Sequence, residues 1–160
     1  MNAIIKRTIM IITLLLVPAI FPFAEDILNE DNVPFNRVQR VDWNLAEVKT
    51  KSSTIVIDRT KAQREIYSIR FQENGMVRGR GADNVYFALY TTSANNFLSI
   101  RRLVSTYMVP LFETESFTEY EYLRHLEKVY RWEFRDWKLK LHTYDENKEE
   151  AILEFIPIYK

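Results

Sequence analysis

A serine–threonine pair and one asparagine are the side chains in this sequence best suited to chemistry. Ser105 and Thr106 would supply a nucleophile pair, and the Asn84 amide would face a ligand. No base lies at an interpretable spacing from the two hydroxyls, so turn closure or helix capping is the favoured interpretation for them. For Asn84, a hydrogen bond from its side chain to backbone at a turn or bulge after Gly81 is favoured over a ligand contact.

Metal and redox chemistry find little support in the sequence. The 2 histidines, His125 and His142, have no carboxylate or cysteine companion at ligand spacing, and we expect both at the surface. Cysteine is absent, which excludes disulfides, thiolate-bound zinc, a catalytic thiol and lipidation of an N-terminal cysteine. The charged run Asp145–Glu150 lacks the glycine of a calcium loop and is interpreted as a solvated hairpin tip. We therefore predict no metal, no cofactor and no enzymatic activity.

Arginines form a candidate ligand patch. Arg78 and Arg80 share one face of a predicted strand, near Tyr86 and Tyr90, and a second pair, Arg101-Arg102, lies further along the chain. Such a patch could hold an anionic ligand or polymer, although charge pairing across a solvated sheet face is the favoured alternative. The 22 basic and 22 acidic residues cancel over the whole chain, so nucleic acid is not expected as a partner.

Short strands must position these side chains. Tyr67, Ile69 and Phe71 alternate with polar residues, which is typical of a strand with one buried face, and Asn74-Gly75 then predicts a tight hairpin turn. The stretch Val85–Tyr90 is apolar on both faces, so we expect it to be covered on both sides. About nine such segments at this spacing indicate a curled antiparallel sheet.

The last predicted hairpin turns at Arg135-Asp136. After the turn, the alternation places one set of side chains in the core and the other in solvent. The core set is Trp137, Leu139 and Leu141, and the solvent set is Lys138, Lys140 and His142.

One segment has a helical period instead. Thr118 and Glu121 fit a capping box, and Tyr122, Leu123, Leu126 and Val129 follow on one face of a helix of about ten residues. The predicted fold class is therefore α+β and mostly antiparallel β: a small curled sheet or partly closed barrel with one packed amphipathic helix. A barrel this small fills its interior with side chains and leaves room for a ligand only at its mouth.

The N-terminal residues indicate export. Residues 1–24 combine Lys6 and Arg7 with the apolar run Ile9–Phe23 and end at Ala24, as a cleavable signal peptide does, with a retained anchor as the alternative. Residues 25–40 are polar and predict a tether or an N-terminal strap, and residues 41–160 form the domain. We expect a periplasmic or secreted protein with no membrane span after cleavage, and the sequence does not indicate its oligomeric state.

Five short motifs follow one another between residues 43 and 155: Trp43–Leu45, Val77–Tyr90, Ser105–Pro110, Glu119–Leu126 and Leu153–Phe155. In this order they resemble the signatures of the META domain family, the HslJ-like heat-inducible envelope proteins. The positions that carry the resemblance are Trp43, Gly79, Asn84, Tyr86, Tyr90, Thr106, Met108, Leu123 and Leu126. The resemblance implies a small β-rich, barrel-like domain with one prominent helix, in agreement with the periodicities.

The resemblance also implies a function. It predicts a non-enzymatic envelope domain that binds a protein or another envelope component and is linked to stress tolerance. The alternative is a small-ligand-binding β-barrel that uses the region of Arg78, Arg80, Tyr86 and Tyr90.

Two signature positions depart from the family pattern. Where family members often have cysteines, this chain has Asp83 and Pro110. If those cysteines form a disulfide in members that have both, Asp83 and Pro110 should lie close in space.

Overall fold

The computed structural model describes residues 33–58, 66–108 and 116–158. The predicted signal peptide, the first part of the predicted tether (residues 25–32) and Pro110 lie outside the described residues, so their predictions stay open. Within the described ranges, no helix is long and apolar enough to cross a membrane.

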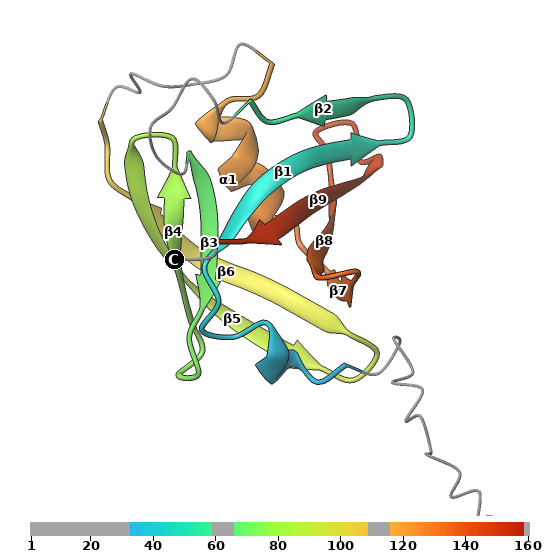
Figure 1. Cartoon of the computed structure of the whole chain (residues 1–160). Coiled ribbons are helices and arrows are strands. Elements are labelled where there is room, and N and C mark those ends of the chain that lie inside the picture. The colour runs from blue at the N-terminus through green and yellow to red at the C-terminus, as the bar shows by residue number, and fades with distance from the viewer. Residues whose placement is uncertain (1–32, 59–65, 109–115, 159–160) are drawn as a thin grey trace, which may run out of the picture.

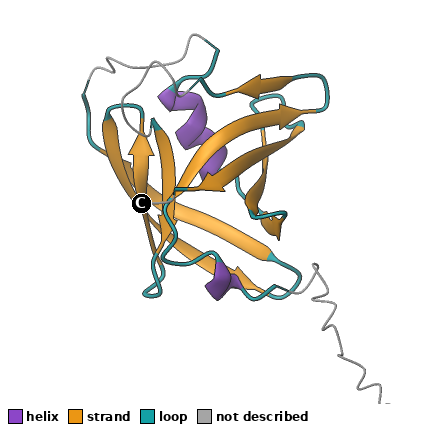
Figure 2. Ribbon diagram, viewed as in Figure 1, coloured by secondary structure: helices purple, strands orange, loops and turns teal. Residues whose placement is uncertain are grey.

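Antiparallel strands make up most of the described chain, and one α-helix interrupts them (Figures 1 and 2). In chain order the elements are β1 (Trp43–Thr50), β2 (Thr54–Val56), β3 (Tyr67–Phe71), β4 (Met76–Gly81), β5 (Asn84–Ser93), β6 (Phe97–Ser105), α1 (Glu119–Glu127), β7 (Arg131–Arg135), β8 (Lys138–Tyr144) and β9 (Glu150–Pro157). A 3-10 helix at Phe35–Arg37 precedes β1.

The strands form a single curled sheet. Its order is β2-β1-β3-β4-β5-β6-β7-β8-β9, and β9 also pairs with β1. Adjacent strands pair over most of their length, except β1 with β3, which share only two residue pairs, and β6 with β7, which share Phe97↔Arg131. The predicted fold class, α+β with a curled, mostly antiparallel sheet and one packed helix, is confirmed.

Local sequence explains where α1 begins and which face it buries. The Thr118 side chain accepts a hydrogen bond from the Glu121 backbone, and the Glu121 side chain accepts one from the Thr118 backbone, which is the predicted capping box. Tyr122 and Leu126 are fully buried against the inner face of the sheet, where α1 meets β4, β6 and β8. The helix therefore fills part of the interior of the curl.

Residues 33–40 form a strap on the sheet. The Phe35 ring lies 5.1 Å from that of Phe71 and 5.0 Å from that of Trp132, and Val38 is fully buried. The Trp43 indole N–H donates to the Val38 carbonyl oxygen at 2.9 Å. Of the two interpretations of segment 25–40, its described part is therefore a strap packed on the domain.

Three burial predictions were wrong. In β5, Tyr86, Ala88 and Tyr90 are buried, but Phe87 and Leu89 are exposed, because only the inner face of the curl is covered. Trp137 is 75% exposed, since the turn falls at Asp136-Trp137, where both residues have positive φ, one position later than predicted.

His142 was predicted at the surface and is buried. It pairs across the sheet with Arg131 of β7 and Ile152 of β9. Its ring lies within 3.5 Å of Glu133 and 3.4 Å of Glu150, so side chains from both neighbouring strands cover it.

Candidate functional site

The Asn84 side chain joins three segments of the fold. Its Oδ1 accepts hydrogen bonds from the Thr106 hydroxyl at 2.9 Å and from the Met108 backbone N–H at 2.8 Å. Its Nδ2 donates to the Met108 carbonyl oxygen at 3.0 Å and to Glu119 Oε2 at 2.7 Å. Asn84 is only 3% exposed; its bond to Glu119 is buried, and its three bonds to Thr106 and Met108 are partly buried. The first residue of β5 thereby holds both the chain after β6 and the start of α1.

Glu119 is the member of this network that the sequence did not single out. It is a buried carboxylate at the first residue of α1, and it accepts from Asn84 and from the Ser105 hydroxyl, the latter at 3.3 Å. A carboxylate in the first turn also meets the positive end of the helix dipole. The only sequence signal was its place in the helix motif, which said nothing about burial.

Gly79 and Tyr86 form a second part of the signature. They are directly opposite on β4 and β5, and the Tyr86 hydroxyl crosses Gly79 to donate to the Ser68 carbonyl oxygen of β3 at 2.9 Å. A Cβ on Gly79 would lie 1.9 Å from that oxygen and 2.5 Å from the Tyr86 hydroxyl. The glycine is therefore required for close approach.

Tyr86 and Tyr122 share a hydrogen bond of 3.1 Å inside the curl. Burial, reinforced by the neighbouring ring hydroxyl, raises the pKa of Tyr86 well above its ordinary value. Burial likewise raises the pKa of Tyr122. Both hydroxyls therefore stay protonated, and their two protons are shared among the contact between them and the contacts that each makes with the Ser68 carbonyl oxygen.

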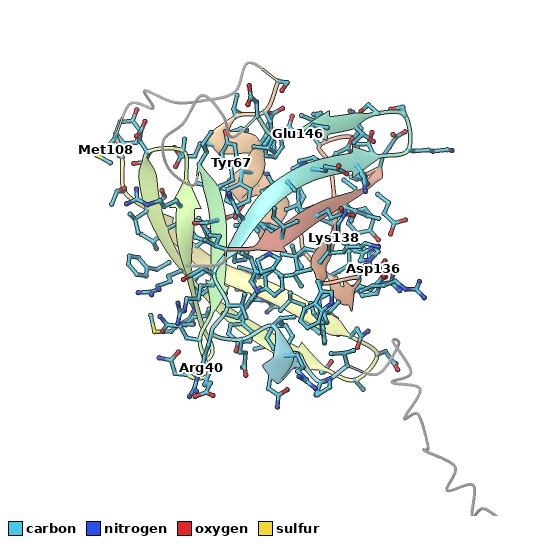
Figure 3. The ribbon with its side chains drawn as sticks, in the orientation of Figure 1. Arg40, Tyr67, Met108, Asp136, Lys138 and Glu146 are labelled. Carbon is cyan, nitrogen blue, oxygen red and sulfur yellow. The ribbon has the colours of Figure 1, made fainter. Side chains whose placement is uncertain are left out.

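The other signature positions are structural in different ways. The Tyr90 hydroxyl donates to the Gln72 carbonyl oxygen at 2.6 Å. Leu126 lies in the core, and Leu123 is partly buried against it. The Met108 backbone hydrogen-bonds the Asn84 side chain, whereas the Met108 side chain points outward (Figure 3). Trp43 anchors the strap, as described above.

The polar groups of this network are engaged with one another. Thr106 Oγ1 accepts from the Val85 N–H at 3.1 Å and donates to Asn84, so its proton is already engaged. The polar contacts of His142 are with Arg131, Glu133 and Glu150, on the other side of the sheet. Among the described residues, no group of three or more potential metal ligands is close enough to hold an ion.

The outward face of β4–β6 combines arginines with exposed apolar side chains. Arg78, on β4, pairs across to Phe87 and then to Val104, and Leu89 pairs with Arg101. Phe87, Leu89 and Val104 are 48, 42 and 67% exposed. We call these three residues, with Arg78, Arg80 and Arg101, the outer β4–β6 face.

The predicted ligand patch is corrected by this geometry. Arg78 and Arg80 point outward, whereas Tyr86 and Tyr90 point inward and are buried, because successive residues of a strand face opposite sides. The predicted charge pairing across the sheet is also not found there. Within the part of the chain that the structure describes, no ion pair involves Arg78, Arg80 or Arg101.

The other half of the sheet pairs its charges. Glu154 of β9 is buried between Lys49 and Lys138, at 2.9 and 2.5 Å. Burial alone would raise the pKa of Glu154, but hydrogen bonds from Lys138 and Lys49 outweigh it and hold the pKa below its ordinary value. Lys140 lies between Glu154 and Glu133 in the cross-strand register. Arg78, Arg80 and Arg101, which have no ion pair with any residue that the structure describes, thus lie in the β4–β6 half of the sheet.

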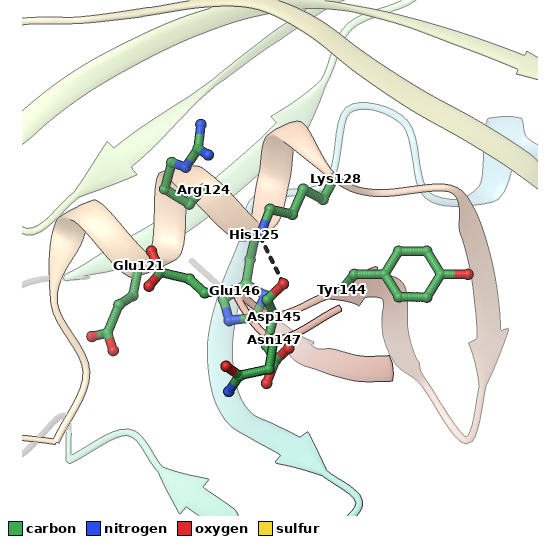
Figure 4. Close-up of a pocket in the computed structure, with 8 residues that line it drawn as sticks. All are labelled: Glu121, Arg124, His125, Lys128, Tyr144, Asp145, Glu146 and Asn147. Atoms are coloured by element: carbon green, nitrogen blue, oxygen red, sulfur yellow. Dashed lines mark hydrogen bonds between the residues drawn. The ribbon is translucent and has the colours of Figure 1, made fainter. Parts of the chain in front are cut away.

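A shallow hollow of about 210 Å³ lies between α1 and the turn that joins β8 to β9 (Figure 4). Its lining mixes both signs of charge, and Lys128 Nζ donates to the Asp145 carbonyl oxygen at 2.8 Å. Burial, with the nearby Lys128 charge, lowers the pKa of His125, which lines this hollow. We therefore interpret this hollow as the space left where α1 packs against the β8–β9 turn, and not as a ligand site.

A comparison with protein families matches the META domain to residues 36–156, three quarters of the chain and all nine strands. The chain belongs to the META domain family. The match begins inside the strap, at the residue after Phe35. Among curated proteins, none matches the sequence.

Two solved structures share the fold of this META domain. A solution structure of a protein from Burkholderia xenovorans has a TM-score of 0.59 at 15% identity, over 78% of this chain and 86% of that one. A crystal structure of a DUF4847 family protein from Bacteroides vulgatus has a TM-score of 0.51 at 13% identity, over 76% of this chain and 95% of that one. At these identities the likeness concerns the fold alone.

The META signature of this chain is thus a packing device. The sequence singled out four of its residues. Asn84 and Thr106 hydrogen-bond each other, and Gly79 leaves the space that the Tyr86 hydroxyl needs to reach Ser68. The outer β4–β6 face lies on the opposite side of the same strands. The sequence pointed to its arginines, but Phe87 and Leu89 were expected to be covered.

Proposed function

We propose that this META domain is an exported, non-enzymatic binding module of the cell envelope that holds an anionic partner on its outer β4–β6 face and contributes to stress tolerance. The observation that carries the proposal is a set of arginines that have no ion pair among the described residues and lie beside exposed apolar side chains. Phe87, Leu89 and Val104 form the apolar centre, and Arg78, Arg80 and Arg101 lie around it.

Charge supports an anionic partner. Strands β4, β5 and β6 contain four arginines and no acidic residue, although acidic and basic residues are equal in number over the whole chain. The β7–β9 half of the sheet neutralises its lysines with Glu133 and Glu154. Arginine is enriched at protein interfaces because its planar group forms bidentate bonds and packs on apolar surface. An acidic partner would give these arginines the counter-charges that the described residues do not supply.

The alternative of a small-ligand barrel needs room inside the curl. Tyr86 and Tyr90, which would line that room, are buried in contact with other core rings. The interior is also occupied by Tyr67, Phe71 and Phe117. Because side chains fill the region, the geometry favours binding on the outer face.

Export and stress tolerance rest on sequence. The basic start and apolar run of residues 1–24 support export, and the family resemblance supports the stress role. Fractionation of cells expressing the full chain tests export: the proposal expects the protein in the periplasmic or secreted fraction with residues 1–24 removed. Retention of the protein in the cytoplasmic fraction would contradict it.

Affinity capture from envelope extracts tests the binding face. The variant Phe87→Ser/Leu89→Ser/Val104→Ser should lose the captured partner, and raising the salt concentration should release it from the natural chain because exposed charge contacts are screened. The matched control Val56→Ser/Tyr120→Ser changes exposed apolar residues elsewhere and should keep the partner. A partner retained equally by both variants, or no partner at all, would refute the proposed face.

A further inference from the structure

A polar hollow of about 360 Å³ lies beside the outer β4–β6 face, at the end of the β3–β4 hairpin. Three of its lining residues are arginines from separate segments: Arg40 of the strap, Arg70 of β3 and Arg78 of β4. Arg40 lies at the lower end of the molecule in Figure 3. The rest of the lining consists of Gln72, Glu73 and Asn74.

The hollow carries an excess of positive charge. Arg40 pairs with Glu73, and Arg70 Nη1 bonds Asp42 Oδ2 at 3.0 Å. Arg78 has no ion pair among the residues that the structure describes. Each guanidinium has five N–H donors, so the two pairs leave Arg40 and Arg70 further donors for a ligand.

Arg70 and Arg78 are also directly opposite each other on neighbouring antiparallel strands. Their side chains project from the same outward face with Cβ atoms roughly 5 Å apart, and like charges in this position destabilise a sheet. Asp42 accepts a hydrogen bond from Nη1 of Arg70. An anion between the two guanidinium groups would turn this repulsion into two attractive contacts.

Amide donors complete the lining. Asn74 Oδ1 accepts from the Met76 backbone N–H at 3.1 Å, which turns the Asn74 oxygen towards the hairpin and leaves its NH₂ group to donate. Gln72 contributes a second side-chain amide. The donors therefore come from the strap, from two strands and from the hairpin turn.

We infer that this hollow is a binding site for a phosphate group, held by Arg78 with Arg70, Arg40 and the Asn74 amide. A carboxylate has two coplanar oxygens and is satisfied by one bidentate arginine, whereas a tetrahedral phosphate offers oxygens in several directions to donors from separate segments. The inference deepens the proposed function, on which it rests for the biological source of the anion, by naming the group that the arginines recognise.

Titration of the ¹⁵N-labelled protein with inorganic phosphate tests the site, read from the arginine Nε–Hε and asparagine side-chain NMR signals. We expect saturable shifts of the Arg78 and Asn74 signals, and at least tenfold weaker binding in Arg78→Gln. The matched control Arg102→Gln, an exposed arginine outside the hollow, should bind as the natural chain does. Acetate at equal ionic strength should give no saturable shift.

Equal shifts with phosphate and acetate, or equal phosphate affinity in Arg78→Gln and Arg102→Gln, would overturn the inference. Dispersed backbone spectra of both variants show that each is folded. Vesicles of phosphatidylglycerol and of phosphatidylcholine, compared with glycerol phosphate, then identify the source of the group. Selective binding to phosphatidylglycerol vesicles that Arg78→Gln abolishes supports a lipid phosphate, and binding of glycerol phosphate alone supports a soluble one.

The two proposals fail separately. If Phe87→Ser/Leu89→Ser/Val104→Ser loses the captured partner but the natural chain does not bind phosphate, only the phosphate site is refuted. If the natural chain binds phosphate saturably but captures no partner, only the proposed binding face is refuted.

Discussion

Replacing Asn84 with aspartate tests whether the META signature is a packing network. The change keeps the size of the side chain and replaces its NH₂ group by a second carboxylate oxygen. That oxygen would face the Met108 carbonyl oxygen at 3.0 Å and Glu119 Oε2 at 2.7 Å, both of which now accept hydrogen bonds. Two attractive contacts would become repulsive ones in a buried place.

The expected loss follows from these contacts. The bond to Met108 contributes about 1 kcal/mol, the bond to the Glu119 carboxylate about 2 kcal/mol, and the repulsion between the new carboxylate oxygen and the partly buried Met108 carbonyl oxygen costs about 1 kcal/mol more. We therefore expect the free energy of unfolding to fall by about 4 kcal/mol at neutral pH. For a domain of this size, that loss lowers Tm by roughly 15 °C.

The pH dependence gives a second readout. Two carboxyl groups in contact take up one proton at a higher pH than an isolated carboxyl would, because they cannot both stay charged. The variant's folded state then binds more protons than its unfolded state, so its penalty is full above that raised pKa and shrinks as the pH falls through it. Its deficit relative to the natural chain should narrow between about pH 7 and pH 5.

Urea denaturation at a series of pH values measures both effects. The control Asn95→Asp changes an exposed asparagine in the β5–β6 turn, and it should shift stability by less than about 0.5 kcal/mol. An Asn84→Asp variant as stable as Asn95→Asp, or one whose deficit does not narrow on acidification, would refute the network argument.

Three further predictions concern other parts of the fold. Gly79→Ala should cost about 3 kcal/mol, because its Cβ would lie 1.9 Å from the Ser68 carbonyl oxygen. Gly75→Ala, at φ +79° and with its Cβ at an ordinary contact distance of 3.7 Å from the Tyr90 carbonyl oxygen, should cost only about 1 kcal/mol. Equal urea midpoints would contradict this. Burial, with the neighbouring Arg131 charge, lowers the pKa of His142 below its ordinary value of 6.5, so stability is present above that value and falls as the pH drops through the lowered pKa. Thermal unfolding of His142→Gln between pH 7 and pH 5 should show a smaller slope than the natural chain, and an unchanged slope would exclude this cause. Trp137→Gly should raise the free energy of unfolding by about 0.5 to 1 kcal/mol, because it relieves positive φ at an exposed turn residue; a fall would show that the Trp137 contact with Phe134 contributes more than the strain costs.

The elements of this fold follow from short-range patterns. Tyr67, Ile69 and Phe71 alternate in the sequence and all face the core, and Thr118 with Glu121 starts α1 as their spacing predicts. The turn after Arg135 was misplaced by one position, since an exposed tryptophan with positive φ is a poor candidate for a turn residue.

The site was less accessible to sequence reasoning. Asn84 could be identified, but its partners Thr106, Met108 and Glu119 are 22, 24 and 35 positions away. Glu119 is an ordinary acidic residue of a helix start until β5 brings Asn84 to it. The same holds for His142, which is buried only because β7 and β9 place Arg131, Glu133 and Glu150 around it.

The strands, the capped helix and the family can be predicted from the sequence, because each depends on residues a few positions apart or on the order of short motifs. Which face of each strand is covered depends instead on how the sheet curls around the helix. A period of two separates the faces of β5 but cannot tell which one the rest of the chain will bury. The curl buries Tyr86 and Tyr90 and leaves Phe87 and Leu89 exposed beside arginines that have no ion pair among the described residues. This arrangement makes the outer β4–β6 face a candidate for binding.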